Sequence, residues 1–344
     1  MTISIIIPVY NVEHYIRRCL ESVIEQKSDD FNIECIMVDD SSPDRSVEIA
    51  QDVINSYKGS GITFILLRHK FNKGVSAARN TGIAAASGDF LYFVDSDDEI
   101  AEKALQFLFT CFIEYPYVDV FVGDTYEEEH QKMVNNIFLN NRDLFLIDDK
   151  AHIWEYVLKR KIDRHVWNKL IRRSIIIDNR IFFDENVTIY EDVIWTYRLF
   201  SHSSSILIMS LMTYKYESNP ASLTHTTVQH VDQLVESLAI VSEYVLTHPP
   251  IVNGRVICYA AHSLFTCRWL MIAIEAADKK DLYNESYSKI ISLRNSLFWD
   301  AIKHLRPFLA LYHLIMFYPL SRMLRYHWFR SKVFRLEQLA YLLS

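Results

Sequence analysis

Three carboxylates stand directly after a short apolar run in the first third of the chain. Residues 90–94 have the composition of a buried strand, and Asp95, Asp97 and Asp98 follow it. Because like charges repel one another and resist burial, such an ending does not by itself favour stability. Mg²⁺ and Mn²⁺ bind oxygen ligands, usually one or two carboxylates and the phosphates of a substrate. The motif therefore predicts a metal–diphosphate site at the tip of a strand, and a solvated acidic turn is the alternative that it leaves open.

The residues before this motif alternate between strand and helix patterns. Strands are predicted at 3–7, 33–38 and 62–67, and helices from Val12, with Asn11 as the N-cap, and over 45–57. This order is typical of a doubly wound α/β unit with a parallel sheet. Asp39-Asp40 and Asp95-Ser96-Asp97 then end parallel strands at one edge of the sheet, where ligands bind in such folds. Two acidic tips facing one crevice predict a nucleotide site.

A third motif, between the two acidic ones, combines a glycine with two cations. Gly74 permits a tight turn. Lys73 and Arg79 supply positive charge where a diphosphate needs it, although Arg79 could instead pair with Asp39 or Asp44. Neither the dinucleotide fingerprint G-x-G-x-x-G nor the P-loop pattern accounts for this segment.

These motifs have the order and spacing of a known family. Residues 1–100 resemble the donor half of a family 2 glycosyltransferase with the GT-A fold. The motifs that carry the resemblance are Ile5-Ile6-Ile7-Pro8-Val9-Tyr10-Asn11, Val38-Asp39-Asp40-Ser41-Ser42-Pro43-Asp44, Asn72-Lys73-Gly74-Val75-Ser76-Ala77-Ala78-Arg79-Asn80-Thr81-Gly82 and Phe93-Val94-Asp95-Ser96-Asp97-Asp98. The departure is Ser42-Pro43-Asp44, where Gly-Ser-Thr-Asp is commoner, and it keeps turn-forming residues.

The resemblance extends to about residue 225. Three further segments resemble acceptor-side and closing motifs of bacterial capsule and lipopolysaccharide transferases: Val166-Trp167-Asn168-Lys169-Leu170-Ile171-Arg172-Arg173, Tyr190-Glu191-Asp192-Val193, and the segment from Tyr214 to His225. The expected organisation is therefore a GT-A catalytic domain over 1–225, with a nucleotide-binding half at 1–100 and an acceptor half at 101–225. Residues 226–344 carry no such motif and are expected to form a helical C-terminal region.

The resemblance implies a set of donor contacts. Pro8 and Tyr10 line the pocket for the base and ribose, and Asp40 accepts a hydrogen bond from the uracil N–H. Lys73 and Arg79 meet the diphosphate.

It also implies the metal ligands. Asp97 holds Mn²⁺ or Mg²⁺, and Asp95 assists directly or through ribose and water, so that the ion offsets charge on the leaving diphosphate. Asp98 is as suited to capping the following helix as to binding the ion.

An inverting transfer needs a base opposite the leaving group, and the resemblance assigns this role to Asp192. Glu191 would orient Asp192 or the acceptor; the alternative for both is an ordinary charge at the start of a helix over 193–200. On the acceptor side, Trp167 offers a face to a sugar or packs in the core. Lys169 meets a phosphate or forms a salt bridge, and His225 touches the donor or lies at the surface.

Composition sets the expected compartment and partners. The net charge of −7 argues against a nucleic-acid-binding protein. Five scattered cysteines without metal-ligand spacing favour a reducing, cytoplasmic compartment, with Cys19 and Cys35 on core faces. The first residues have no basic leader or cleavage site, and their apolar run is read as the first strand.

The segment 307–320 is the most hydrophobic of the chain, and basic and aromatic residues flank it. It is short for a membrane span, which needs about 20 apolar residues. Its flanks favour a helix lying on an anionic membrane surface, at the inner face of the cell membrane, and a core helix is the alternative.

The leading hypothesis is an inverting, metal-dependent glycosyltransferase that moves a sugar from a UDP-sugar to a lipid-linked or oligosaccharide acceptor in surface polysaccharide synthesis. Cys267-Arg268-Trp269 resembles the Arg-Trp pair of processive synthases, but Phe265 replaces the expected Gln or Arg, so a non-processive enzyme is expected. A nucleotidyltransferase is one alternative, although 8–11 lacks the Gly-rich basic loop. A non-catalytic sugar- or nucleotide-binding module is the other.

Overall fold

The computed structural model describes residues 1–127, 132–133, 144–158, 162, 164–187, 189–217, 219, 240 and 244. The chain divides into two compact units, one of residues 1–153 with 161–222 and one of residues 154–160 with 223–344. The sheet and the candidate site described below belong to the first unit. The segment 307–320, the Arg-Trp pair at 268–269 and His225 lie outside the described residues.

The first hundred residues form strands and helices in strict alternation. They are β1 (Thr2–Val9), α1 (Ile16–Ile24), β2 (Asn32–Asp39), α2 (Ser46–Ser56), β3 (Ile62–Arg68), α3 (Val75–Ala85), β4 (Phe90–Phe93) and β5 (Glu99–Ile100). The four strands predicted from apolar runs are therefore β1, β2, β3 and β4, and the helix predicted over 45–57 is α2.

The remaining described elements alternate less regularly. They are α4 (Ala104–Glu114), β6 (Val120–Glu127), β7 (Lys132–Met133), β8 (Leu144–Ile147), α5 (Lys150–Leu158), β9 (Lys169–Arg172), α6 (Arg173–Asp178), α7 (Glu191–His202) and β10 (Ile206–Tyr216).

The described strands join one sheet in the order β3-β2-β1-β4-β9-β6-β10-β5, with β7 beside β6 and β8 beside β10. β3, β2, β1 and β4 run parallel, with Ile3 opposite both Ile33 and Phe90. β9 runs antiparallel to β4 and to β6. The chain first builds outward from β1 through β2 to β3, and then crosses to β4 on the other side of β1. This reversal is the switch point at which open α/β sheets bind ligands, and it confirms the predicted α/β fold class.

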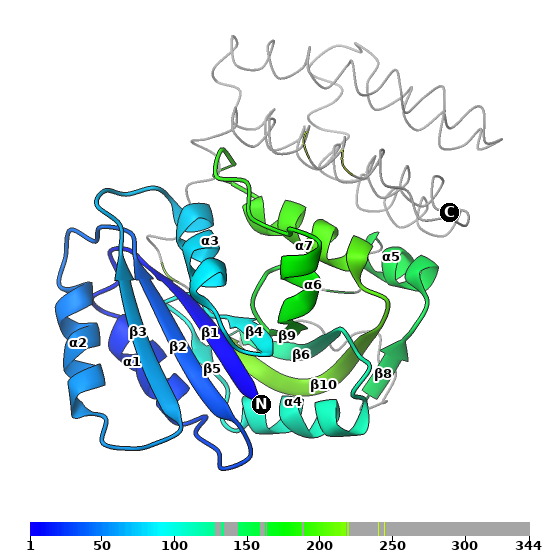
Figure 1. Ribbon diagram of the computed structural model, residues 1–344, viewed down its shortest axis with the longest axis horizontal. Helices are drawn as coiled ribbons and strands as arrows, with labels where there is room; N and C mark the ends of the chain where they lie inside the picture. The colour runs from blue at the N-terminus through cyan, green and yellow to red at the C-terminus, as the bar shows by residue number, and fades with distance from the viewer. Residues whose placement is uncertain are drawn as a thin grey trace, which may run out of the picture. The chain divides into compact units, whose positions relative to one another are not determined.

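Helices cover both faces of the sheet (Figure 1). On one face, alternate β1 residues such as Ile3 and Ile5 join a core with α1, α2 and α4. On the other face, α3 packs so closely that a Cβ on Gly82 would lie 2.4 Å from Ile6 Cγ2. Ile3, Ile5 and Ile6 are all 0% exposed. Burial on both sides explains the continuous β-branched run that begins the chain.

The predicted start of the first helix is wrong by four residues. Asn11 has φ 54° and does not cap a helix; α1 begins only at Ile16. The backbone N–H groups of 11–13 are instead bound by side chains of the 42–46 turn: Val12 N donates to Ser46 Oγ at 2.9 Å and Glu13 N donates to Asp44 Oδ2 at 2.9 Å. These bonds keep the backbone after β1 out of the helical conformation and at the mouth of the crevice.

Two further observations concern compartment and membrane. Cys19 and Cys35 are fully buried, as predicted from their core positions. Within the described ranges, no helix is both long and apolar enough to cross a bilayer.

Candidate active site

Three parallel strands end beside one another and deliver the predicted donor residues to one edge of the sheet. Tyr10 follows β1, Asp40 follows β2 and Asp95 follows β4 closely, with β1 in the middle of the three. Asp40 N donates to Val9 O at 2.9 Å, and Val94 N donates to Ile6 O at 3.1 Å, so the pairing continues up to the acidic residues. The two acidic tips therefore flank the end of β1.

The three carboxylates after β4 have three different environments. Asp95 Oδ1 accepts a hydrogen bond from Arg79 Nη2 at 2.8 Å. Asp97 Oδ2 accepts one from Asn219 Nδ2 at 2.9 Å. Asp98, 1% exposed, accepts hydrogen bonds from the Tyr214 hydroxyl at 2.7 Å and from a backbone N–H after β10 at 2.8 Å.

The expectation that Asp98 caps a helix is therefore wrong, because β5 follows it and its carboxylate is turned toward β10. Burial, followed by the charges of Asp97 and Asp95, raises the pKa of Asp98 well above its ordinary value. Its carboxyl group holds the end of β10 against the acidic loop, so it is a structural link and is not open to a ligand.

Asp97 carries unbalanced negative charge. Burial, and then the neighbouring charge of Asp95, raises the pKa of the Asp97 carboxyl. Asn219, which contacts it, is a neutral amide. The nearby cation Arg18 binds the Asp97 carbonyl at 3.3 Å, but its guanidinium forms ion pairs with Glu99 and Glu217.

Arg79 joins the acidic loop to the start of α7. It is 4% exposed, and its two terminal nitrogens donate to Asp95 Oδ1 and Glu191 Oε1, both at 2.8 Å. The alternative prediction, that Arg79 pairs with Asp39 or Asp44, is therefore wrong. The predicted diphosphate contact is also not supported, since a guanidinium this buried and turned to two carboxylates presents little of itself to a ligand. Arg79 instead brings two predicted functional carboxylates together.

Packing explains why α7 starts at this point. Phe93 at the end of β4 packs edge-on against Trp195 of α7, with ring centroids 5.2 Å apart, and Phe183 stacks on the Trp195 indole at 4.8 Å. Trp195 is 0% exposed. A large aromatic cluster of this kind fixes the helix against the sheet, so that Glu191 and Asp192 in its first turn lie close to Arg79.

The two carboxylates at the start of α7 differ in environment. Burial, then the charge of Asp192, raises the pKa of Glu191 to about 7, although Arg79 acts in the opposite direction. Asp192 Oδ1 accepts a hydrogen bond from the following backbone N–H at 2.7 Å, and its side chain is partly exposed. Both carboxylates are partly exposed, and Glu191 is the one that Arg79 holds.

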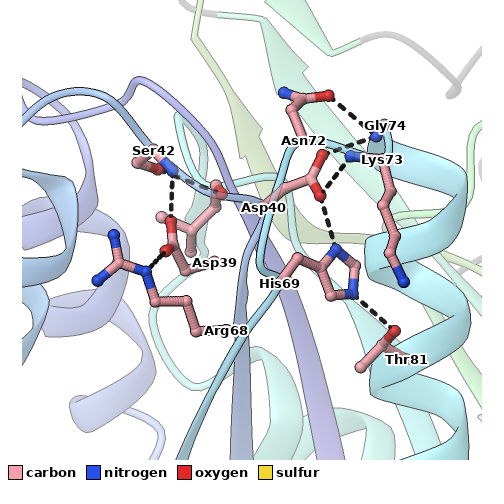
Figure 2. A network of polar contacts seen from close by, with 10 residues as sticks. Asp39, Asp40, Ser42, Arg68, His69, Asn72, Lys73, Gly74 and Thr81 are labelled. Atoms are coloured by element: carbon pink, nitrogen blue, oxygen red, sulfur yellow. Dashed lines mark hydrogen bonds and ion pairs between the residues drawn. The ribbon is translucent and has the colours of Figure 1, made fainter.

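Asp40 is the centre of a network that organises the loop after β3 (Figure 2). Its carboxylate accepts hydrogen bonds from Lys73 N at 2.8 Å and Gly74 N at 2.7 Å, and His69 Nδ1 lies 2.6 Å from Oδ1. Gly74 has φ 89°, which suits glycine, and α3 follows directly. Asp40 therefore fixes the turn that leads into the helix carrying Arg79.

The remaining predicted donor residues lie at the rim. Pro8 is partly buried in β1, and Tyr10 is 47% exposed. The side chain of Lys73 is exposed, and its ammonium lies 5.6 Å from the centroid of the Phe71 ring, which is 63% exposed. The exposed ring of Tyr10 fits contact with a base, and the exposed ammonium of Lys73 fits contact with a phosphate.

The structure corrects the predicted acceptor contacts. Trp167 is 5% exposed and stacks on His165 at 4.3 Å and on Tyr214 at 4.7 Å, so its indole packs in the core and has no face for a sugar. Lys169 is 0% exposed, and its ammonium donates to His165 O at 2.7 Å and Asn168 Oδ1 at 2.9 Å. It is a buried structural lysine, not a surface cation for an acceptor phosphate. His225 lies outside the described residues.

Three residues that contact the predicted site residues were given no role of their own from the sequence. His69, Tyr214 and Asn219 contact Asp40, Asp98 and Asp97 respectively. His69 directly follows β3 on the ligand-binding edge, and Tyr214 and Asn219 belong to the closing motif that begins at Tyr214. Their contacts with the acidic loop depend on where β10 pairs, which the sequence does not reveal.

The donor set suits a hard divalent cation. Arg79 binds one oxygen of Asp95, and Asn219 binds one oxygen of Asp97. Mg²⁺ and Mn²⁺ commonly take one or two carboxylates and complete their shell with water and substrate phosphates. Among the residues that the structure describes, no cluster of three or more His, Cys, Asp or Glu side chains forms a closed metal site.

The amino-acid sequence also matches a family model. The model described as glycosyl transferase family 2 matches residues 4–180. The chain belongs to this family. The match includes most of β1, all of β2 to β4, the acidic loop and the segment around Trp167.

Two curated relatives are similar over the same part of the family 2 chain. EpsJ of Bacillus subtilis, an uncharacterized glycosyltransferase, is 32% identical over 229 residues, 64% of this chain and 62% of the relative. The minor teichoic acid biosynthesis protein GgaA of Bacillus subtilis is 34% identical over 200 residues, 56% of this chain and 42% of the relative. The chain thus matches less than two thirds of the length of either relative.

A solved structure shares the fold of this family 2 chain. Residues 1–349 of TarS from S. aureus, in complex with UDP-GlcNAc, align with a TM-score of 0.75 at 19% identity, over 96% of this chain and 92% of that one. At this identity the likeness concerns the fold alone, and it agrees with the GT-A architecture.

Proposed function

We propose that this chain is an inverting, metal-dependent, non-processive glycosyltransferase that uses a UDP-sugar as donor. The observation that carries the proposal is the Arg79 bridge, whose nitrogens lie 2.8 Å from both Asp95 and Glu191. It joins the acidic loop, where the donor diphosphate and metal are expected, to the first turn of α7, where the base is expected. This bridge supports a single site for both halves of the transfer reaction.

The donor would lie across the ends of β2, β1 and β4. Tyr10 offers an exposed ring to the base, Asp40 an acceptor for the uracil N–H, and Lys73 a cation for the phosphates. Asp97 and Asp95 would hold Mn²⁺ or Mg²⁺, which supplies Lewis-acid stabilisation of the departing diphosphate. Arg79 holds Asp95 in place and offsets part of the negative charge of the loop.

Asp192 is proposed to take the proton from the acceptor hydroxyl as its oxygen attacks the anomeric carbon. A carboxylate in this role must be accessible to the acceptor; Asp192 is partly exposed, whereas the carboxylate of Glu191 is held by Arg79. Glu191, held by Arg79, would orient the first turn of α7.

The acceptor is proposed to be lipid-linked or an oligosaccharide, in surface polysaccharide synthesis at the cytoplasmic face of the membrane. Support comes from GgaA, which is named for teichoic acid biosynthesis, and from a neighbour that binds UDP-GlcNAc. Membership of glycosyl transferase family 2 argues against a nucleotidyltransferase.

A donor panel tests the proposal. The full chain is incubated with UDP-glucose, UDP-galactose, UDP-GlcNAc and GDP-mannose, with Mn²⁺ or with a chelator, and nucleotide release is measured. We expect release of UDP from at least one UDP-sugar, lost with the chelator. Release from GDP-mannose alone would contradict the UDP assignment, and binding of UDP without turnover of any donor, with candidate acceptors present, would favour the non-catalytic module.

The membrane assignment rests on the sequence of 301–344 and has its own test. Deleting these residues should move the protein from the membrane to the soluble fraction, and the full chain should bind anionic liposomes more weakly as salt rises. A full chain that ignores anionic liposomes at low salt would contradict this assignment. Aggregation of the truncated protein would favour the alternative of a core helix.

A further inference from the structure

His69 lies at the third strand end of the crevice and connects two of its elements. It directly follows β3, and its backbone N–H donates to Asp39 O at 2.9 Å. Its imidazole spans from Asp40 Oδ1, 2.6 Å from Nδ1, to Thr81 Oγ1 on α3, 2.9 Å from Nε2 (Figure 2). The side chain of His69 is 7% exposed and that of Asp40 4% exposed. Both ring nitrogens are engaged by these two contacts, so the imidazole holds Asp40 and offers no further hydrogen bond to a ligand.

The hydrogen bonds of Asp40 can be counted. An ionised carboxylate has about four acceptor positions. On Oδ1, His69 and Lys73 N take two; on Oδ2, Gly74 N takes one. One position on Oδ2 is left for a ligand, and its direction is set by the three internal donors. Two of these are backbone groups of a loop, so His69 is the side-chain donor that ties the carboxylate to the rest of the fold.

Asp40 and Thr81 together fix the tautomer and the orientation of His69. Asp40 can only accept, so Nδ1 must carry the hydrogen that faces it. When the imidazole is neutral, Nε2 is then an acceptor, and the Thr81 hydroxyl can donate to it across the 2.9 Å contact. Without that hydroxyl, Nε2 would lose this donor and the ring its hydrogen bond to α3. The hydrogen bond made by one ring nitrogen sets the state of the other.

We propose that His69 is a positioning residue for the donor. Held by Thr81, His69 fixes Asp40 so that the remaining acceptor position of Asp40 accepts a hydrogen bond from the N–H of a uracil base. The inference rests on the proposed function, because it assumes a UDP donor. It deepens that function by extending base recognition to two residues that do not contact the base. It also links the base pocket to α3, the helix that carries Arg79.

The test measures UDP binding by calorimetry in the presence of Mn²⁺. Loss of a hydrogen bond to a charged group corresponds to roughly ten-fold weaker binding or more, so His69→Ala should weaken UDP binding by about that factor. His69→Asn keeps an N–H near the position of Nδ1 and should recover most of the affinity. Thr81→Val should weaken UDP binding, whereas Thr81→Ser, which keeps the hydroxyl, should not. His14→Ala removes a histidine whose side chain is 83% exposed and is the matched control.

Kinetics and spectroscopy separate positioning from a general loss of stability. With the donor that the panel identifies, His69→Ala should raise the donor KM by a larger factor than it lowers kcat. In ¹⁵N-histidine spectra, the signal that His69→Asn removes should have the Nδ1–H pattern in the wild type and should shift when UDP is added. Thr81→Val should change that pattern.

The outcomes distinguish this inference from the proposed function. A wild type that does not bind UDP overturns the UDP donor, and the role of His69 falls with it. A wild type that binds UDP, with His69→Ala binding equally well while its melting temperature falls, overturns the role of His69 alone. Equal affinities for His69→Asn and His69→Ala, both weakened, would also contradict it, because the effect would then not depend on the N–H donor.

Discussion

Replacing Arg79 with methionine should destabilise the fold in a pH-dependent way. The guanidinium is 4% exposed and forms two ion pairs of 2.8 Å. Methionine has a comparable length and keeps much of the packing, but it leaves two carboxylates facing each other without the cation. The side chain of Glu191 is 12% exposed and that of Asp95 is 29% exposed, so neither is fully returned to water.

Two effects set the size of the loss. Removing one partner of a buried ion pair costs about 3–5 kcal/mol. Asp95 is partly solvated, which reduces its share. Glu191 can also take up a proton, because its pKa already lies near 7, and protonation limits the penalty. We therefore expect the free energy of unfolding at pH 7 to fall by about 2–4 kcal/mol.

The pH dependence follows from the raised pKa of Glu191. In the folded chain this carboxyl binds its proton more tightly than at its ordinary value of 4.5. Its contribution to stability is therefore fully present below about pH 4.5 and is lost as pH rises through about 7. Arg79 lowers the pKa of Glu191. Without it the pKa rises further, and the loss of stability continues to higher pH.

Urea denaturation of the wild type and Arg79→Met at pH 5 and pH 8 measures this difference. The variant should lose less stability at pH 5 than at pH 8. Arg45→Met is the matched control, since Arg45 makes an exposed ion pair with Glu48 at 2.9 Å and such pairs contribute little. Equal losses for Arg79→Met at both pH values, or a loss no greater than that of Arg45→Met, would refute the reasoning.

Three further substitutions test the site. Asp97→Ala should abolish the Mn²⁺ dependence of UDP binding and leave the fold intact, as titration calorimetry would report; an unchanged Mn²⁺ effect would remove Asp97 from the metal site. Asp192→Asn should keep donor binding and lose transfer by about two to four orders of magnitude; a near-normal rate would point to Glu191 as the base. Trp167→Ala should cost about 3–5 kcal/mol of stability, more than Trp167→Phe; a raised acceptor KM at unchanged stability would instead restore the sugar-stacking prediction.

The local pattern of the sequence was sufficient for the donor half of the fold. Each predicted strand is an apolar run that ends in polar turn residues. β1, β2 and β4 are buried as the pattern required, whereas β3, at the end of the strand order, is only partly buried. The placement of Asp40 and Asp95 at one edge follows from parallel pairing alone. The start of α1 could not be read in this way, because the side chains that bind its preceding backbone come from another turn, at Ser46 and Asp44.

The acceptor half shows the limit of prediction from local sequence patterns. Trp167 and Lys169 look like surface recognition residues in a linear motif, yet both are buried, because β9 lies between β4 and β6 in the middle of the sheet. Their burial is decided by strands far away in the sequence. Arg79 is a similar case: its cationic character was evident, but its partner Glu191 is 112 residues away. Buried polar side chains take the partners that the tertiary fold brings to them, and spacing along the chain does not identify these.

The acidic loop gains its specificity from this packing. Its motif presents Asp95, Asp97 and Asp98 as three similar candidates for a metal. In the folded chain, Arg79 neutralises Asp95, and the hydroxyl of Tyr214 binds Asp98 from β10. Asp97 keeps a neutral amide as its side-chain partner among the described residues, and both burial and Asp95 raise its pKa. The fold thus gives three carboxylates that look alike in the sequence three different environments, and the Asp97→Ala titration tests whether this one binds the metal.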